Sequence, residues 1–536
     1  MYFTLAVSAA TSETCAALAD AAVRTDPRIM PIPGPGRVAW RAPDGRAAIL
    51  HWGEDRRLGT SHAGTIWAEG DAVRARTGLA RIDPVYQAEI TGSAVVSDRA
   101  SWAAAATGRL RDPDPAMIGA FLSLGYPVGG ATPFRGVRTL GGDQVLRAVG
   151  GRLAVTRARS DGEGPGGPAR VAAALTEAVR PLREAAAPVV LSLTGGKDSR
   201  LVAAALTAAR VPFTARTHGF ASHPDVLVAR LIAKHLRVEH TVTEPTAPGT
   251  PDEADVLGRL RAAVLVSDGM LSAFENVGRP DPPVGDRPAE AGGHGGELLR
   301  GGYAQAAWRT PAALGAAAAA ELFRRMTTRR LSLLRPGPAR AYLASLTGPA
   351  AALACGPLTA LDDFYLINRA GRWSAAARQA YLLRSPLAQP LFADSVVRAA
   401  RAVPLADRVS DRLHRDVLAA LCPELLALPL AGTPWQGEPR TPATVLIPPP
   451  DAGSADWRRG LGEAVAGFLR GYVLDHDAAS PLFSIVRRQA AERLLCSPHA
   501  DPQGAWALAT LAALLSGDWL NARGPAGPAL ISRGRT

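Results

Sequence analysis

The alternation of apolar and polar positions separates a strand-rich first part of the chain from a second part with mixed elements. Short apolar runs between Gly, Pro and Asp turns are typical of β-strands, and they recur from residue 1 to about residue 158. Within that part the pattern predicts one helix, near residues 115–125. The Gly- and Pro-rich residues 160–168 break regular structure and form the expected linker.

Beyond the linker, apolar strands alternate with helices, a pattern that predicts βαβ units and a parallel sheet. The predicted strands cover residues 188–193, 213–217 and 239–242, and the predicted helices cover 170–183, 199–210 and 225–236. Helix then follows helix at residues 312–326, 369–383, 394–402, 412–426, 457–473 and 505–520, with a Pro/Gly-rich loop at 432–451. The predicted fold class is therefore α/β, with a β-rich region before the parallel sheet and a mainly helical part after it.

The composition is that of a folded protein with more than one domain. A chain of 536 residues exceeds the usual size of one domain, and 47% hydrophobic with 20% charged residues excludes wholesale disorder. The net charge of +12 first suggests a polyanionic partner. However, Lys197 and Lys234 are the only lysines, and the arginines are dispersed among acidic residues without a basic run. We interpret the charge as a compositional drift towards arginine and expect no nucleic-acid partner.

Cysteine usage and the apolar runs predict a soluble, cytoplasmic protein. The four cysteines form no CxxC pair and have no His or Cys at zinc-ligand spacing, so we expect neither a disulfide framework nor a structural zinc ion. They are Cys15, Cys355, Cys422 and Cys496. Residues 1–7 predict a strand rather than a signal peptide, and the longest apolar stretch, 312–320, is too short to cross a bilayer. We therefore expect no membrane partner.

Residues 191–201 carry the most informative chemistry. A predicted strand runs into two glycines there, and a helix is expected to begin near Ser199. Glycines let the backbone turn sharply and bring N–H groups against an anion, and a helix start adds partial positive charge. The loop departs from the Walker A pattern because Asp198 follows Lys197. We predict a phosphate-binding loop at the carboxyl end of a parallel strand. The alternative is an ordinary Gly-Gly turn with Asp198 or Ser199 capping the next helix.

Each polar residue of this loop has an expected role. Thr194 and Ser199 offer hydroxyl groups, and Lys197 offers a compact ammonium group to the β- and γ-phosphates. Asp198 suits a place beside phosphate only if it holds Mg²⁺. The order hydroxyl-Gly-Gly-x-Asp-Ser resembles the loop of ATP pyrophosphatases, which split ATP into AMP and pyrophosphate while adenylating a substrate.

Further segments resemble asparagine synthetases, and the similarity spans roughly residues 171–430. It rests on residues 214–240, on the glycine-rich stretch 292–303, which ends in Gly-Tyr, and on residues 384–404. The resemblance implies a Mg²⁺ site formed by Asp198 and Glu297. It also implies ATP contacts from Leu193, Thr194, Gly195, Gly196, Asp198, Ser199 and His218.

The glycine-rich stretch 292–303 departs from the family pattern. The magnesium-side Asp of the family is Gly296 here, and the active-site Glu is Gly293, so Glu297 alone remains of its acids. His294 could replace a base, or it could be a solvated loop residue.

The lysine that the family uses in its C-terminal half is also missing. Arg412 or Arg415 could supply the positive charge, although neither would accept a proton at neutral pH. Both could equally be helix-surface arginines. The expected catalytic residues are Lys197, Glu297, Arg412 and Arg415.

The N-terminal region resembles the glutaminase domain of the same family more weakly, at residues 96–99, 134–137 and 141–142. Asparagine synthetases carry a nucleophilic cysteine directly after the initiator Met. Because Tyr2 stands there in this chain, we expect no hydrolysis of glutamine. The predicted domains are a degenerate glutamine-amidotransferase-like domain at 1–160 and a synthetase-like domain at 171–536, with an α/β core at 171–310 and a mainly helical part at 311–536.

The resemblance implies an ATP-dependent, AMP-forming amide ligase or cyclase. ATP and Mg²⁺ would be its cofactors, and small-molecule or peptide carboxylates and amines its substrates. An alternative is a catalytically impaired relative that binds nucleotide or a partner protein, because two acids of the glycine-rich stretch are lost. A third hypothesis is RNA thiolation, which generally requires a cysteine near the nucleotide, whereas the last three cysteines fall in predicted helical or helix-end segments.

Overall fold

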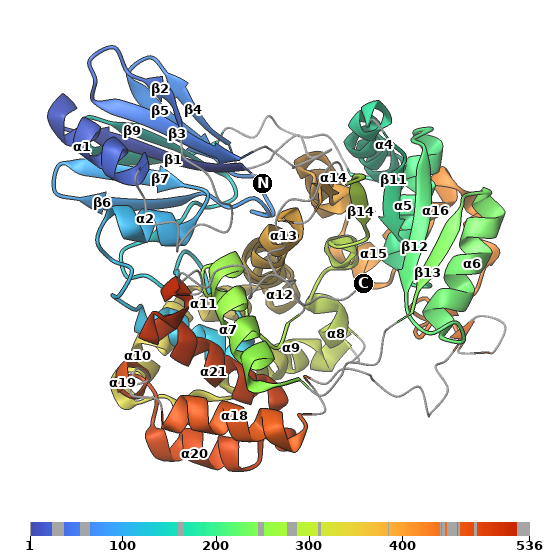
Figure 1. The fold of residues 1–536 in the computed structure, drawn as a ribbon. Coiled ribbons are helices and arrows are strands. Elements are labelled where there is room, and N and C mark those ends of the chain that lie inside the picture. Colours follow the sequence, from blue (N-terminus) through green and yellow to red (C-terminus); the bar gives the residue numbers. More distant parts are fainter. Residues whose placement is uncertain are drawn as a thin grey trace.

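A computed structural model describes most of the chain. The described residues are 2–23, 37–53, 65–158, 166–185, 187–244, 251–275, 287–308, 312–383, 385–439, 441, 445–446, 458, 461–475 and 480–521. Figure 1 shows a strand-rich N-terminal region, a helical part beside it and a parallel sheet on the other side of the molecule.

The N-terminal region consists of two antiparallel sheets, with strand orders β2-β3-β1-β7-β6-β8 and β10-β9-β5-β4. Ala6 and Ile49 of the first sheet share an apolar core with Val73 and Leu146 of the second, so the sheets pack face to face. Their strands are β1 (Tyr2–Ala9), β2 (Arg37–Arg41), β3 (Ala47–Gly53), β4 (Thr65–Glu69), β5 (Ala72–Arg76), β6 (Tyr86–Ile90), β7 (Ser93–Ser97), β8 (Arg138–Thr139), β9 (Gln144–Val149) and β10 (Arg152–Arg157). The predicted β-rich region is confirmed.

Three helices accompany these sheets, namely α1 (Ser12–Val23), α2 (Ala100–Ala106) and α3 (Pro115–Leu124). The sequence predicted α3, whose start is marked by Asp114 capping the backbone N–H groups of Ala116 and Met117. It missed both α1 and α2, and α2 begins without any side-chain cap and spans only two turns.

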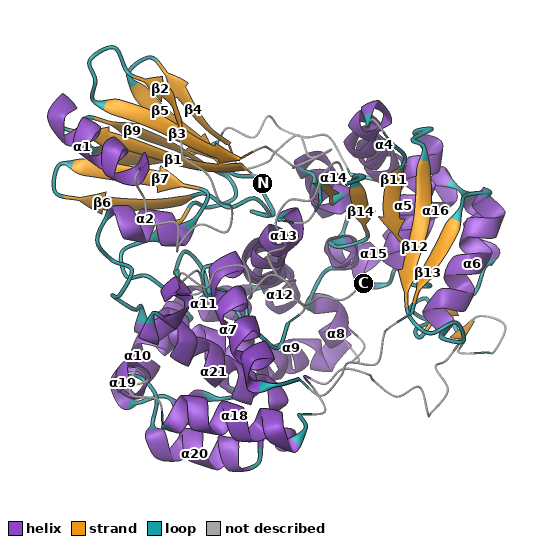
Figure 2. Cartoon of the chain, viewed as in Figure 1, coloured by secondary structure: helices purple, strands orange, loops and turns teal. Residues whose placement is uncertain are grey.

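The second sheet system is parallel throughout, with the strand order β13-β12-β11-β14-β15. Its strands are β11 (Val189–Ser192), β12 (Phe213–His218), β13 (His240–Thr243), β14 (Glu290–Gly292) and β15 (Leu387–Ala388). Figure 2 shows helices packed around these strands; among them are α4 (Pro168–Val179), α5 (Lys197–Ala208), α6 (Pro224–Leu236), α14 (Asp394–Arg401) and α16 (Arg412–Leu421). The predicted α/β class is confirmed, while β14 and β15 are too short to leave an apolar pattern.

The remaining helices are α7 (Glu253–Ser267), α8 (Ala304–Trp308), α9 (Ala312–Thr328), α10 (Pro336–Ser345), α11 (Thr347–Cys355), α12 (Pro357–Phe364), α13 (Ala375–Leu382), α15 (Leu405–Val409), α18 (Glu463–Leu474), α19 (Ser480–Phe483), α20 (Arg488–Cys496) and α21 (Pro502–Ser516). Most of them follow residue 311, as expected, whereas α7 and α8 lie within the stretch 171–310 that was predicted as the α/β core. None of the helices that the structure describes combines the length and the apolar character needed to cross a bilayer.

Several predicted boundaries were wrong. The helix expected from Ser199 begins at Lys197, and the helix expected at 369–383 is a π-helical segment at Tyr365–Ser374 followed by α13. The helix expected at 412–426 ends at Leu421, because the chain turns at Cys422 into the 3₁₀ helix Pro423–Ala427. The helix expected at 457–473 is described from Glu463, and Trp457 lies outside the described residues.

Two segments predicted to be irregular hold some structure. Pro168, the last residue of the expected linker, opens α4, while residues 160–165 lie outside the described chain. Within the expected loop 432–451, strand β17 (Val445–Leu446) pairs in parallel with β16 (Leu430–Ala431).

Candidate functional site

The predicted phosphate loop lies between β11 and α5, at the carboxyl end of the central strand of the parallel sheet. Strand β11 ends at Ser192, and Gly196 is the N-cap of α5, without a side-chain cap. The backbone N–H of Leu193 donates to the Arg216 carbonyl at 2.9 Å, and its own carbonyl accepts from Thr217 Oγ1 at 2.7 Å. Leu193 therefore anchors the loop to β12.

Side-chain oxygens hold the backbone of this loop. The N–H of Thr194 donates to Ser199 Oγ at 3.0 Å, and the N–H of Gly196 donates to Thr194 Oγ1 at 3.3 Å. The N–H of Gly195 donates to Asp225 Oδ1 at 3.0 Å. We expected these N–H groups to face an anion, whereas each of them is engaged by a protein oxygen.

Gly195 permits a close contact that a side chain would prevent. A Cβ at this position would lie 2.6 Å from Ala431 Cβ and 2.8 Å from Val228 Cβ. The Gly195 carbonyl accepts from the N–H of Ala431 at 3.0 Å. The loop is thus packed between α6 and β16, which explains the glycine better than backbone flexibility does.

Lys197 occupies the first turn of α5 and forms a buried ion pair. Its Nζ donates to Asp411 Oδ2 at 2.5 Å and lies 5.0 Å from the centre of the Trp435 ring. Asp411 also accepts from Gln305 Nε2 at 2.8 Å and from the N–H of Gln436 at 3.0 Å. Burial lowers the pKa of Lys197, and the Asp411 carboxylate opposes that shift. Asp411 thus fixes the direction of the lysine side chain.

Asp198 forms the second ion pair of the same helical turn. Arg300 Nη2 donates to Asp198 Oδ2 at 2.7 Å. The other oxygen, Oδ1, is buried and finds no hydrogen-bond donor among the described residues. Burial raises the pKa of the Asp198 carboxyl, against the opposing effect of Arg300.

His414 lies beside this carboxylate and is fully buried. Its Nε2 donates to the Lys197 carbonyl at 3.2 Å, because a carbonyl can only accept. The Nδ1 lone pair therefore faces Asp198 Oδ1 at 3.8 Å, and it too lacks a hydrogen-bond partner within the described chain. Burial and then Arg300 lower the pKa of His414 to about 3, so the imidazole is neutral at pH 7.

The glycine-rich stretch packs directly on the start of α5. A Cβ at Gly296 would lie 2.1 Å from Asp198 Cγ, and a Cβ at Gly293 would lie 2.4 Å from the Ser199 nitrogen. The acids that the resemblance places at these two positions could not fit this packing. Glu297 lies in the 3₁₀ helix Gly296–Arg300 and is half-buried. Its side chain hydrogen-bonds with Tyr365. Burial, and then the charge of Glu297, raise the pKa of the Tyr365 hydroxyl.

The other predicted residues differ in their distance from the loop. His218 is the last residue of β12, beside the loop, and its side chain is exposed. The side chain of His294, in the glycine-rich stretch, is exposed as well. Arg415 forms an ion pair with Glu438 at 2.7 Å and lies 5.9 Å from the centre of the Trp435 ring, which also contacts Lys197. Arg412 is exposed and pairs only with Asp407 and Asp416 among the described residues.

Sequence reasoning missed three residues of this cluster, namely Arg300, Asp411 and His414. A helical spacing of three and four residues places Asp411, His414 and Arg415 on one face of α16, and Arg412 on another. That periodicity was the available signal. No local pattern pairs Arg300 with Asp198, because the two residues meet only when the glycine-rich stretch folds onto α5.

Comparison with known proteins adds a partial match. Residues 170–261 match the family model described as asparagine synthase. The match runs from α4 through the loop and α6 into α7. No curated protein matches the chain. The family uses ATP, and the match supports an ATP-pyrophosphatase-type ligase in general. The resemblance to the asparagine synthetase family is therefore confirmed over residues 170–261.

Proposed function

We propose that the protein is an ATP-dependent, AMP-forming amide ligase that does not hydrolyse glutamine. The observation that carries this proposal is the placement of Lys197 and Asp198 in the uncapped first turn of α5, within the segment that matches the asparagine synthase family. Lys197 and Arg300 provide positive charge beside the loop, which a triphosphate requires. Tyr2 in place of cysteine is the basis for glutamine independence.

In the proposed reaction, a carboxylate oxygen of the acid attacks the α-phosphorus of ATP. The bond from that phosphorus to the bridging oxygen breaks, and pyrophosphate leaves. The amine nitrogen then attacks the acyl carbon, AMP leaves, and the amine loses one proton. His414 is a poor acceptor for that proton, because its pKa is lowered to about 3. The proposed substrates are small-molecule or peptide carboxylates and amines.

Asp198 is the residue that best fits Mg²⁺. Its Oδ1 is a buried carboxylate oxygen without a donor in the described chain, and Mg²⁺ prefers oxygen ligands. Arg300 can stay on Oδ2 while Oδ1 takes a cation. Bound Mg²⁺ would neutralise phosphate charge. Glu297, on the neighbouring 3₁₀ helix, is the second proposed ligand.

A catalytically impaired, nucleotide-binding relative is the second candidate. The observation that favours it is that Lys197 and Asp198 are both held by ion pairs within the protein, with Asp411 and Arg300. Three backbone N–H groups of the loop are engaged as well. ATP would have to replace some of these contacts.

ATP–pyrophosphate exchange with a panel of carboxylic acids, combined with ATP-binding measurements, separates the two candidates. Lys197→Met should lower exchange by about 100-fold or more, the effect of removing one charge-stabilising group. Asp198→Asn should lower exchange and raise the Mg²⁺ concentration that exchange requires, because the amide oxygen carries no charge to hold the ion. Arg324→Ala is the matched control, because Arg324 is exposed and pairs with Glu321 on the surface of α9.

Each outcome decides between the candidates. Exchange that requires Lys197 and Asp198 supports the ligase. ATP binding without exchange for any acid supports the impaired relative. An Asp198→Asn variant that exchanges like the wild type contradicts the Mg²⁺ assignment, and a chain that binds no ATP contradicts both candidates.

A further inference from the structure

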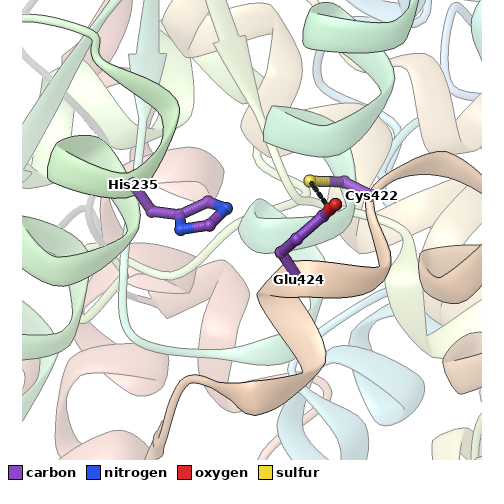
Figure 3. Close-up of side chains that lie close together, drawn as sticks. All are labelled: His235, Cys422 and Glu424. Atoms are coloured by element: carbon purple, nitrogen blue, oxygen red, sulfur yellow. Dashed lines mark hydrogen bonds between the residues drawn. The ribbon is translucent and has the colours of Figure 1, made fainter.

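Three potential metal ligands meet at the C-terminal end of α6, whereas Asp225 and Val228, which contact the loop, lie near the start of that helix. His235 lies in the last turn of α6, and Cys422 and Glu424 lie where α16 turns into the 3₁₀ helix Pro423–Ala427. Their ligand atoms all lie within 4.8 Å of one another. Figure 3 shows the imidazole of His235 directed towards the Cys422 sulfur and the Glu424 carboxylate.

The sequence expectation of no zinc-type set considered only residues close together along the chain. The fold brings His235 to Cys422, although nearly 200 positions separate them. Within the part of the chain that the structure describes, these three residues are the one such group of His, Cys, Asp and Glu side chains. The other buried cysteine, Cys15, belongs to an apolar core.

The ligand types select the metal. Imidazole, thiolate and carboxylate together form a donor set typical of Zn²⁺, whereas Mg²⁺ and Ca²⁺ prefer oxygen alone. Ligand atoms of a tetrahedral zinc site are about 3.5 Å apart, as follows from bond lengths of about 2.0–2.3 Å. Cys422 Sγ already lies 3.4 Å from Glu424 Oε2. His235 and Glu424 are exposed, so their side chains can close the remaining distance around the buried thiol.

We propose that His235, Cys422 and Glu424 bind one Zn²⁺ ion, with water as the fourth ligand. In the metal-free protein, the Cys422 thiol donates to Glu424. Zinc binding replaces that hydrogen bond with a sulfur–zinc bond and releases the thiol proton to solvent.

The ion would join two segments that support the candidate loop. Helix α6 carries Asp225, which accepts the Gly195 N–H. The segment after Glu424 supplies the carbonyls of Leu425, Leu428 and Pro429 to the guanidinium of Arg200 in α5. A zinc ion between these segments would therefore stabilise the support of the loop, whether or not the protein forms amides.

Zinc titration of the purified full chain tests the proposal. Chelator-treated, reduced protein is titrated with Zn²⁺ against a chromophoric chelator, and Co²⁺ is used as a spectroscopic probe. We expect one Zn²⁺ per chain, a thiolate-to-cobalt charge-transfer band and a melting temperature that rises with the Zn²⁺ concentration. Cys422→Ser should remove the band and weaken Zn²⁺ binding by more than about tenfold, a loss that even outer-shell changes reach.

Variants at the exposed ligands keep the test valid if Cys422→Ser folds poorly. His235→Asn and Glu424→Gln change exposed side chains and should also weaken Zn²⁺ binding by more than about tenfold. Cys496→Ser is the matched control, because Cys496 is an exposed, free thiol, and it should bind like the wild type. Absence of stoichiometric binding, a cobalt spectrum without the thiolate band, or equal binding by the three ligand variants and the wild type would overturn the proposal.

Discussion

Alanine at Gly296 would probe how closely the glycine-rich stretch packs on α5. A Cβ there would lie 2.1 Å from Asp198 Cγ and 2.6 Å from Asp198 Cβ, whereas non-bonded carbon atoms normally stay about 3.5–4.0 Å apart. Either the stretch moves by roughly 1 Å, or Asp198 leaves Arg300. Overpacking of this kind costs about 1–3 kcal/mol. For a cooperative unit of about 150–250 residues, that cost lowers the melting temperature by roughly 2–12 °C.

Thermal unfolding of Gly296→Ala, Asp198→Ala and the double variant measures this effect. Truncating Asp198 removes the Cγ at 2.1 Å and leaves only its Cβ, at 2.6 Å, in contact with the new methyl group. The clash is relieved in part, so the two penalties should add incompletely, with a coupling of about 0.5–3 kcal/mol. Gly467→Ala is the control, because a Cβ there meets nothing within 4 Å and an exposed helical Gly→Ala change stabilises by about 0.5–1 kcal/mol. A Gly296→Ala variant that melts like the wild type, or additive penalties, would refute the packing argument.

Two further predictions concern α16. Burial lowers the pKa of His414 to about 3, so the unfolded chain takes up a proton at a higher pH than the folded protein does. The free energy of unfolding of the wild type should therefore fall as the pH drops below about 6.5, by on the order of 4 kcal/mol at pH 3. His414→Gln should reduce this loss, as measured by urea unfolding at each pH. Arg412→Ala should leave ATP affinity unchanged, since the exposed ion pairs of Arg412 contribute only about 0–1 kcal/mol. Arg415→Ala removes a contact with Trp435 and should weaken ATP binding. Equal effects of the two variants on ATP affinity would contradict this distinction.

The elements around the loop were predictable because their signals are local. Val189 and Leu191 point into the core from β11, and the apolar residues of α5 and α6 follow the helical period. The predicted start of α5 was two residues late, because Ser199 is a typical capping residue while the true N-cap, Gly196, gives no side-chain signal.

The partners of the loop residues could not be predicted in the same way. Lys197 pairs with Asp411, which lies 214 positions away in the sequence, and Asp198 pairs with Arg300, which lies 102 positions away. The chain has 58 arginines dispersed among acidic residues, so composition offers no way to choose among the many possible pairs. The loss of acids at Gly293 and Gly296 was visible in the sequence, but its steric cause became clear only from the packing against α5.

The N-terminal region is part of the folded core, whether or not it has a catalytic role. Arg378, fully buried, pairs with Asp83 at 2.9 Å, and Asp268 pairs with Arg99 and accepts from the Ala100 N–H at 2.7 Å. Breaking one buried pair by removing a partner costs about 3–5 kcal/mol, and proteins are stable by only about 5–15 kcal/mol. Helix α3 also shares one apolar core with α7 and α21. The described residues after the N-terminal region therefore depend on this region for stability, which gives a physical reason for its presence whether or not it has a catalytic role.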